Sequence, residues 1–489
     1  MQGAYPILSC AEANAFEDNF FGGDEARVWA AMRGAGRGVA HGILADFAEL
    51  GAWPGSARVL ALLGKGRNAG DALLAVAELC RIYPDTRVSV VFAFGERALR
   101  GPALRAWRAL DGAARVLRIG DGPAEACDVV IDGVFGSSFR SPLTPGVGAL
   151  LAWADAVSAR LRAAVDLPSG LGEPGAFRAD FTYATGIVKA PLLELANAGR
   201  VRRVDLGFFA TSNQFGYKML GLGEETLRGL RGLRPGAWDK RAFGHVLLVA
   251  GSRRYAGAAM MATLAALRGG AGLVTAAVPE SLIAAFAARV PEAMWLALPE
   301  TPDGGLALEG LGLVREAFGR SDAVVLGPGL GRERETLALA AAIAADSPRP
   351  LVIDADALRP EIVGRGDAPR VLTPHAGEWT RIADAVPAGA VVVRKGPVTR
   401  LATAGAGGPV YHSFFGGPVL ARGGSGDILA GLVGACLART PGDPLGAAAR
   451  GVVWHGLAAD ALARARGAEA VRTTELLDHL APALRGGVG

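Results

Sequence analysis

The chain has 489 residues, of which 51% are hydrophobic and 20% are charged, a composition typical of folded proteins with roughly two to four domains. The formal net charge of +4 is too small and too dispersed to indicate a nucleic-acid-binding protein. The four cysteines form no C-x-x-C pair, and we expect neither a signal peptide nor a membrane span. These features predict a cytoplasmic protein.

The first half of the chain begins with a helical pattern and continues as alternating strands and helices. Apolar residues at helical spacing predict helix from about residue 12 to residue 50. The continuous apolar run Arg58–Leu63 is typical of a parallel strand buried on both faces. Further strands are expected at 88–94, 116–119, 129–132 and 163–166. This alternation predicts a doubly wound parallel sheet.

Polar residues follow three of these strands, in the segments 64–71, 132–138 and 165–170. Ligands of such sheets bind at the carboxyl ends of the strands. Asn68, Asp132 and Ser169 offer oxygen ligands to a cation. Asp166 is a candidate general base, and a turn cap before Pro168 is the alternative for it.

These segments resemble motifs of the NAD(P)H-hydrate epimerases: GxGNNGGDG, D-x-x-F/L-G-S/T-G and V-D-I/L-P-S-G. The likeness spans roughly residues 5–215 and implies a Rossmann-like domain that interconverts the R and S hydrates. It implies K⁺ at Asn68, Asp132 and Ser169, and catalysis by Asp166. The substrate contacts that it implies are Asn68, Ala69, Gly70, Asp71, Gly136, Ser137, Ser138, Phe139 and Arg140.

Four positions depart from the epimerase pattern. Arg67 replaces the first asparagine of the loop, and Ala69, Ala72 and Ser138 replace glycines. Added side chains where the backbone should approach substrate phosphates are expected to crowd the site. We therefore predict weak epimerase activity that depends on Asp166. A non-catalytic nucleotide-binding or interaction module is the alternative for this half.

The strand and helix pattern loosens between Phe208 and Trp238, through Thr211–Gln214 and the Pro235-Gly236 pair. We place the domain boundary here, with domains at 1–220 and 221–489. A second strand and helix series begins with the run 245–251. Its further strands are expected at 273–278, 323–326, 351–353, 371–373 and 391–394.

Polar residues again mark the strand ends of the second series. Asp354 and Asp356 are each suited to hold Mg²⁺ through water or to cap a helix. His375 shares a loop with Glu378, and Lys395 with Thr399 suits a phosphate. The glycine turn 423–426 opens an apolar helix, so its backbone N–H groups form an anion site.

Asp427 lies at the mouth of this anion site, where a carboxylate can take a proton from a hydroxyl facing a phosphate. A helix N-cap is the alternative for Asp427. The sequence contains no G-x-x-x-x-G-K-S/T motif, so the protein is not a P-loop ATPase.

The ordered motifs of residues 235–480, among them GPGLG, I-D-A-D-A-L, K-G-x-x-T and GSGD, resemble the ribokinase-like ADP- or ATP-dependent NAD(P)H-hydrate dehydratases. The resemblance implies a ribokinase-like α/β sandwich with Asp427 as the base. It implies that Ala258, Gly329 and His375 line the hydrate pocket. Nucleotide contacts would be Lys395, Gly396, Thr399, Gly424, Ser425 and Gly426.

Together the two resemblances imply a bifunctional enzyme that repairs hydrated NADH and NADPH with ADP or ATP, Mg²⁺ and K⁺. Its partners would be these small molecules and further copies of itself in a homo-oligomer, without nucleic acid or membrane. The competing hypothesis is a small-molecule kinase of the same fold, with a non-catalytic N-terminal binding module, since kinases also pair G-x-G-D with an Asp base.

Overall fold

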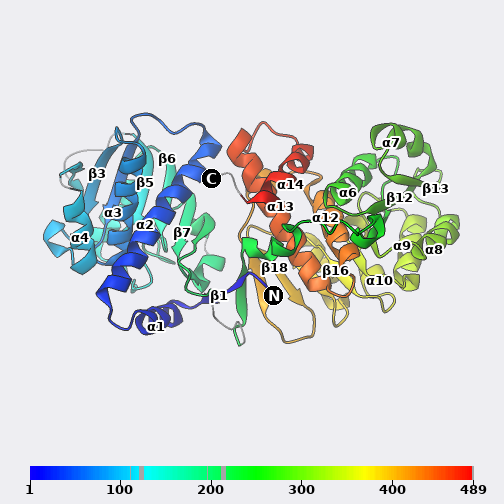
Figure 1. Cartoon of the computed structure of the whole chain (residues 1–489), viewed down its shortest axis with the longest axis horizontal. Helices are drawn as coiled ribbons and strands as arrows, with labels where there is room; N and C mark the ends of the chain where they lie inside the picture. Colours follow the sequence, from blue (N-terminus) through cyan, green and yellow to red (C-terminus); the bar gives the residue numbers. More distant parts are fainter. Residues whose placement is uncertain (111, 120–125, 195, 211–215, 487–489) are drawn as a thin grey trace. The chain divides into compact units, whose positions relative to one another are not determined.

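The computed structural model describes residues 1–110, 112–119, 126–194, 196–210 and 216–486. The chain forms two compact units, Tyr5–Tyr217 and Lys218–Gly489, and the second also takes in Met1–Ala4 (Figure 1). The segment Thr211–Gln214, which is part of the loosened stretch between Phe208 and Trp238, lies outside the described residues. The sequence did not indicate that the first four residues belong with the second unit.

The Tyr5–Tyr217 unit is built on a parallel sheet of seven strands in the order β4-β3-β2-β5-β6-β7-β9. The strands are β2 Arg58–Leu63, β3 Arg87–Phe92, β4 Ala114–Val116, β5 Cys127–Gly133, β6 Ala159–Val165, β7 Phe181–Thr185 and β9 Arg200–Val204. The helices are α1 Cys10–Phe21, α2 Glu25–Phe47, α3 Arg67–Ile82, α4 Gly101–Ala109 and α5 Pro145–Asp155. The doubly wound parallel sheet expected from the sequence is confirmed.

The two faces of this sheet bury separate cores. Val59, Ala61 and Leu63 of β2 pack with α2 and α3, whereas Leu60 and Leu62 pack with α5. Alternate residues of a strand point to opposite faces, so a strand covered on both sides is apolar throughout. This burial explains the continuous apolar run of β2.

Two segments of this unit differ in detail from the sequence predictions. The helical segment expected from about residue 12 to residue 50 is confirmed but is divided into α1 and α2, because Gly22 and Gly23 adopt positive φ angles of 56° and 80° between them. The strand expected at 116–119 is the shorter β4, which ends at Val116, although the backbone N–H of Leu117 still donates to Val90 O of β3 over 2.8 Å. A short strand, β1 Ala4–Leu8, pairs through its end with β8 Val188–Lys189.

The second unit has a mixed sheet in the order β13-β12-β11-β14-β15-β16-β17-β18-β19-β10. Its strands are β10 Met219–Leu222, β11 His245–Val249, β12 Leu273–Pro279, β13 Met294–Leu298, β14 Ala323–Leu326, β15 Leu351–Ile353, β16 Arg370–Leu372, β17 Val391–Arg394, β18 Thr399–Thr403 and β19 Val410–Ser413. The β17–β18 and β18–β19 pairs are antiparallel. The sequence analysis missed β10, β13, β18 and β19, which lie towards the ends of the sheet order.

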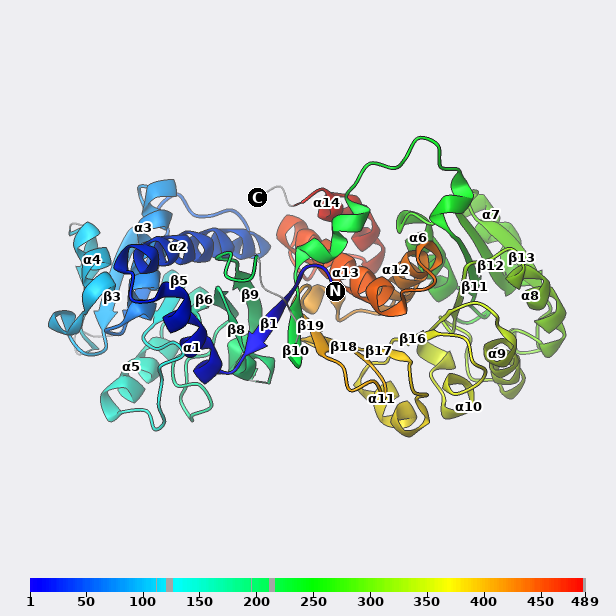
Figure 2. The same cartoon turned by 60° about the horizontal axis from the view of Figure 1, so that its bottom comes forward.

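Helices cover both faces of the second sheet (Figure 2). The helices are α6 Ala256–Arg268, α7 Ile283–Arg289, α8 Leu311–Phe318, α9 Arg334–Asp346, α10 Pro360–Val363, α11 Ala376–Ile382, α12 Ser425–Arg439, α13 Pro444–Arg466 and α14 Leu476–Arg485. Helix α12 approaches one face so closely that a Cβ on Gly434 would lie 2.3 Å from Val325. Val324 and Leu326 point to the other face, in the core that contains α8 and α9. The second unit is therefore an α/β sandwich, with a mixed sheet between two layers of helices. Among the described residues, none of the helices is both long and apolar enough to cross a membrane.

Candidate functional sites

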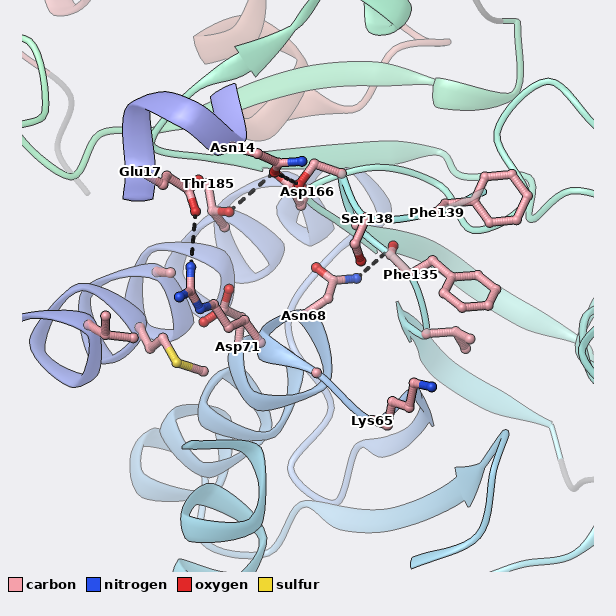
Figure 3. Close-up of a pocket in the computed structure, with 18 of the residues that line it drawn as sticks. Asn14, Glu17, Lys65, Asn68, Asp71, Phe135, Ser138, Phe139, Asp166 and Thr185 are labelled. Carbon is pink, nitrogen blue, oxygen red and sulfur yellow. Dashed lines mark hydrogen bonds and ion pairs between the residues drawn. The ribbon is translucent and has the colours of Figure 1, made fainter. Parts of the chain in front are cut away.

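The first candidate site is a cavity of about 800 Å³ at the carboxyl ends of β2, β5 and β6 (Figure 3). Three elements meet there: the start of α3, the loop after β5 and the end of β6. Helix α1 contributes Asn14 and Glu17 to the wall. The polar strand ends singled out in the sequence therefore meet at one place.

Asp166 follows β6 with a positive φ of 67°, a conformation that is uncommon outside glycine. Its backbone N–H donates to Tyr183 O over 2.8 Å. Its carboxylate is paired with the ammonium group of Lys189 and accepts a hydrogen bond of 3.3 Å from the Thr185 hydroxyl. The carboxylate therefore lies among side chains at the cavity rather than capping the turn before Pro168.

Asn68, Asp132 and Ser169 lie around the loop that follows β5. Asp132 is fully buried, and its carboxylate accepts hydrogen bonds from the backbone N–H and hydroxyl of Ser169, each 2.7 Å long. Asn68 donates to Phe135 O over 2.8 Å. Burial raises the pKa of Asp132 to about 6, against the effect of these hydrogen bonds. The three side chains present oxygen atoms of the kind that a hard cation prefers.

Most of the expected substrate contacts line the cavity, namely Asn68, Asp71, Gly136, Ser137, Ser138, Phe139 and Arg140. Gly136 lies between two polar groups, because a Cβ placed on it would be 3.0 Å from Asp166 Oδ2 and 3.4 Å from Asn68 Oδ1. Ala69 and Gly70 are buried and do not line the cavity. Gly70 instead packs against Met32 of α2, so Ala69 and Gly70 can reach a substrate only through their backbone.

The expected crowding of the substrate by Ala69 and Ala72 was wrong. Both side chains belong to the core between the sheet and α2, and Ala72 packs against Gly133. The reason is the helical period, which turns these two positions away from the cavity while Asn68 and Asp71 face it. Of the four departures from the epimerase pattern, only Arg67 and Ser138 line the cavity.

We therefore expect substitutions of Arg67 and of Ala72 to affect epimerisation differently. We expect Ala72→Gly to leave the KM of epimerisation unchanged and to lower the free energy of unfolding by about 1 kcal/mol, because it removes a buried methyl group from a helix. We expect Arg67→Asn to change the KM, because Arg67 lies at the cavity, 3.6 Å from Glu17. Steady-state kinetics and urea denaturation of both variants test this. A lower KM in Ala72→Gly would restore the crowding hypothesis.

Sequence reasoning missed three residues of this site. Lys189 is 1% exposed and forms the ion pair with Asp166. Asn14 accepts a hydrogen bond of 2.6 Å from the Ser137 hydroxyl, and Glu17 faces Arg67. A lysine in an otherwise apolar stretch was the available signal for Lys189, whereas nothing in the pattern of α1 distinguished Asn14 or Glu17.

The second candidate site is at the start of α12. Gly424 is the N-cap residue with a φ of 92°, and it packs so closely on Met261 that a Cβ would lie 2.3 Å from the methionine methyl group. Asp427 lies in the first turn of α12 and is not the N-cap, so the capping alternative for it was wrong. The turn leaves the first N–H groups of α12 without helical acceptors, which suits an anion.

Lys395 and Asp354 lie beside this turn. Lys395 Nζ is 3.0 Å from Asp354 Oδ1, which also accepts a hydrogen bond of 2.7 Å from the Thr373 hydroxyl. A Cβ on Gly426 would lie 3.3 Å from Lys395 Nζ, so the ammonium group is close to the turn. Asp354 precedes the short helix Ala355–Ala357 as its N-cap residue, but its side chain makes no capping hydrogen bond and instead orients Lys395.

The pKa of Asp427 is raised to about 7, chiefly by burial and by the nearby charge of Asp354. Lys395 acts in the opposite direction. A carboxylate with a pKa close to neutrality is suited to accept a proton and release it again at physiological pH.

A smaller cavity of about 320 Å³ contains His375 together with Asp356, Arg332, Arg359 and Arg381. His375 is exposed and caps α11, since its Nδ1 accepts hydrogen bonds from the N–H groups of Gly377 and Glu378. The three arginines outnumber the carboxylates of Asp356 and Glu378 in the lining of this cavity, and this excess of positive charge favours anionic groups.

The two remaining expected pocket residues lie together. A Cβ on Gly329, whose φ is 65°, would be 2.8 Å from the Cβ of Ala258 at the start of α6. The Ser252 hydroxyl donates to Gly329 O over 2.9 Å and holds this turn in place. The positive φ and the close approach both require glycine at position 329.

The fold and the two sites define a two-domain α/β enzyme, with a buried ion pair at one cavity and an anion-binding turn beside a raised-pKa carboxylate at the other. Two family models match the chain: "NAD(P)H-hydrate dehydratase" over residues 246–482 and "YjeF-related protein N-terminus" over residues 30–190.

Relatives match both halves of the chain. The bifunctional NAD(P)H-hydrate repair enzyme Nnr of Gloeobacter violaceus is 36% identical over 479 residues, which cover 89% of each chain. The enzyme of the same name from Thermosynechococcus vestitus is 32% identical over 532 residues and 99% of each chain. The chain therefore belongs to the family of bifunctional NAD(P)H-hydrate repair enzymes. Because the relatives that match both halves of the chain are repair enzymes, they argue against the hypothesis of a small-molecule kinase.

Two solved structures resemble the second half of the chain. One is an ADP/ATP-dependent NAD(P)H-hydrate dehydratase from Bacillus subtilis, co-crystallised with ATP and Mg²⁺. It is 28% identical to this chain, and the match covers 53% of this chain and 95% of the dehydratase, with a TM-score of 0.45. The other is a ribokinase-like superfamily protein from Enterococcus faecalis, which is 26% identical, covers 56% of this chain and 98% of its own, and has a TM-score of 0.47.

Proposed function

We propose that the two units divide the repair of hydrated NAD(P)H between them. The Tyr5–Tyr217 unit epimerises the R and S hydrates with Asp166 as the base, and the second unit dehydrates the S hydrate with Asp427 as the base. Membership of the repair-enzyme family supports the reaction, and the placement of Asp427 beside an anion-binding turn supports its role.

In the dehydratase site, Asp427 takes the proton of the ring hydroxyl, and the hydroxyl oxygen then attacks the terminal phosphoryl group of the nucleotide. A phosphorylated oxygen leaves as phosphate more readily than a hydroxyl leaves as hydroxide, and loss of a proton from the adjacent ring carbon completes the elimination that restores the dihydronicotinamide ring. The N–H groups of Gly424, Ser425 and Gly426 stabilise the charge that develops on the phosphoryl oxygens. Lys395, Gly396 and Thr399 hold the nucleotide.

His375 is proposed to bind the hydrate, and the three arginines that share its cavity support this role, since the substrate carries a diphosphate. Ala258 and Gly329 would border the same substrate. Mg²⁺ would be held by the nucleotide phosphates and by water hydrogen-bonded to Asp356, and it would offset the phosphate charge. The direct partners of Asp354 are Lys395 and Thr373, which argues against direct ligation of the ion by that residue.

In the epimerase site, K⁺ would be held by Asn68, Asp132 and Ser169. The oxygen-rich and buried donor set fits a hard monovalent ion. Such an ion would fix the loop after β5, which carries Gly136 and Ser137 to the cavity. The Ala69 and Gly70 backbone, and the side chains of Asp71, Ser138, Phe139 and Arg140, would contact the substrate.

The experiment that tests the function combines the purified chain, hydrated NADH or NADPH, and ADP or ATP, and follows the return of the cofactor's absorbance. Absence of recovery with either nucleotide would contradict the proposal. The same assay decides between ADP and ATP and between the two hydrates. A homo-oligomer and a location in the cytoplasm stay predictions from the sequence.

We expect the two units to act independently. A fragment of residues 218–489 should repair the S hydrate and leave the R hydrate to its slow spontaneous conversion, because Asp427 and Lys395 are both within it. Separating the two hydrates by chromatography during the reaction measures this. If the fragment consumed both hydrates as fast as the full chain does, the first unit would have no part in repair.

A further inference from the structure

The cavity of the Tyr5–Tyr217 unit contains a second buried carboxyl group, that of Asp71, to which the proposed role of Asp166 as the base gives no function. Asp71 lies on α3, is 8% exposed and lines the same cavity as Asp166. Its Oδ1 atom is buried and has no hydrogen-bond partner among the residues that the structure describes. A buried oxygen without a partner is costly, so a role in which the substrate supplies the partner would account for it.

The surroundings of Asp71 and Asp166 differ. Asp166 is paired with the Lys189 ammonium group, whereas Asp71 has no such cation in direct contact among the described residues. Figure 3 shows Asp71, Glu17, Asn68 and Asp166 around the same part of the cavity.

Burial raises the pKa of Asp71 well above its usual value, and the charges of Asp166 and Glu17 raise it further. The charges of Lys189 and Arg67 oppose this rise without cancelling it. The cavity therefore holds one carboxylate paired with an ammonium group, Asp166, and one carboxyl group whose burial favours its neutral form, Asp71. Such a pair is the arrangement by which enzymes supply a base and an acid at the same pH.

Glu17 is the competing acid, since burial also raises its pKa. Arg67 lies 3.6 Å from its carboxylate, and this contact favours the charged form of Glu17. Asp71 is also the more buried of the two. These differences favour Asp71 as the proton donor.

The chemistry of the hydrate can use such a pair. Hydration places a hydroxyl on the ring carbon that is bonded to the ring nitrogen, so that carbon is a hemiaminal. We propose that Asp71 is the general acid of the epimerase and protonates the ring nitrogen while Asp166 takes the hydroxyl proton. This inference rests on the proposed epimerase function.

Opening and closing of the ring return both carboxyl groups to their starting protonation states. As the hydroxyl proton moves to Asp166, the carbon–oxygen bond becomes a carbonyl and the carbon–nitrogen bond breaks. The nitrogen keeps the electron pair of that bond and receives the proton of Asp71, which gives an open-chain aldehyde and an N–H group. Rotation of the aldehyde presents its other face. The nitrogen then attacks that face, Asp166 returns its proton to the oxygen, and Asp71 recovers its proton from the nitrogen.

The test measures the kcat and KM of epimerisation in the full chain, with separated R and S hydrates and across a range of pH. Asp71→Asn keeps the size of the side chain but cannot give up a proton, so we expect kcat to fall by about a hundredfold or more with little change in KM. The wild-type rate should decline as pH rises through the pKa of Asp71, and this decline should be absent in the variant.

Two further variants complete the test. Glu78→Gln is the matched control, because Glu78 is also a buried carboxyl group on α3, about two helical turns after Asp71. Glu78 is paired with Arg81 outside the cavity, so we expect this variant to keep the wild-type kcat. Glu17→Gln should keep the alkaline decline. A raised KM with unchanged kcat in Asp71→Asn would overturn the inference and make Asp71 a binding residue. Absence of epimerisation by the wild type would instead contradict the proposed function.

Discussion

Replacing Asp427 with asparagine is expected to lower the rate of NADH recovery by about a hundredfold or more while nucleotide affinity stays nearly unchanged. The physical reason is that the amide has the size of the carboxylate but cannot accept the hydroxyl proton. The anion-binding turn is built by Gly424 and the backbone of α12, so its geometry does not depend on this side chain. Turnover kinetics and nucleotide titration by calorimetry measure the two effects separately.

The matched control is Asp384→Asn, which removes an exposed carboxylate from the same unit and should keep the wild-type rate. An Asp427→Asn variant with most of its turnover intact would show that another group removes the proton. In that case the raised pKa of Asp427 would reflect only its burial near Asp354.

The dependence of dehydration on pH follows from the same residue. The pKa of Asp427 is about 7, because burial and the charges of Asp354, Asp356 and Glu378 raise it more than Lys395 lowers it. The base acts in its ionised form, so kcat/KM should rise with pH through about 7 and then level off. The residual activity of Asp427→Asn should lack this rise.

The second large effect is expected from Lys189→Met. This change leaves the buried Asp166 carboxylate without its cation, and we expect the free energy of unfolding of the Tyr5–Tyr217 unit to fall by about 3 kcal/mol. Epimerase activity should fall with it, because Asp166 loses the contact that orients its carboxylate. Hydrogen exchange of the strands β5 and β6 reports the stability of this unit within the full chain.

Two controls separate the ion pair from other effects of the substitution. Lys218→Met removes an exposed lysine and should leave both measurements unchanged. The double variant Lys189→Met with Asp166→Asn should recover much of the stability and none of the activity, since asparagine tolerates the positive φ of residue 166 and leaves no buried charge without a partner. Wild-type stability and activity in Lys189→Met would mean that the pair has no part in either.

The local features of both sites were predictable because their residues are close in sequence. The turn before Asp427 is formed by consecutive glycines that open an apolar helix, so its chemistry can be recognised from one short segment. The same holds for the strand ends that carry Asn68, Asp132 and Ser169. Apolar runs predicted the parallel strands buried in the middle of both sheets.

The missed strands β10, β13, β18 and β19 show the limit of this reasoning. Strands near the end of a sheet are less completely buried, so their apolar pattern is weaker than that of the central strands. For instance, Val410 of β19 is partly exposed and Met294 of β13 is exposed. The antiparallel return of β18 onto β17 also depends on pairing that no local pattern indicates.

The sequence by itself determined the fold class, the family resemblance and the position of the two proposed bases, because each depends on short motifs or on periodicity. Only the tertiary structure decided which side chains face the cavities. The period of α3 turns Ala72 into the core and Asp71 into the cavity, and folding brings Lys189 to Asp166 and Asn14 to Ser137. These contacts join segments distant in the chain, so they follow from the packing of helices on the sheet and not from local sequence.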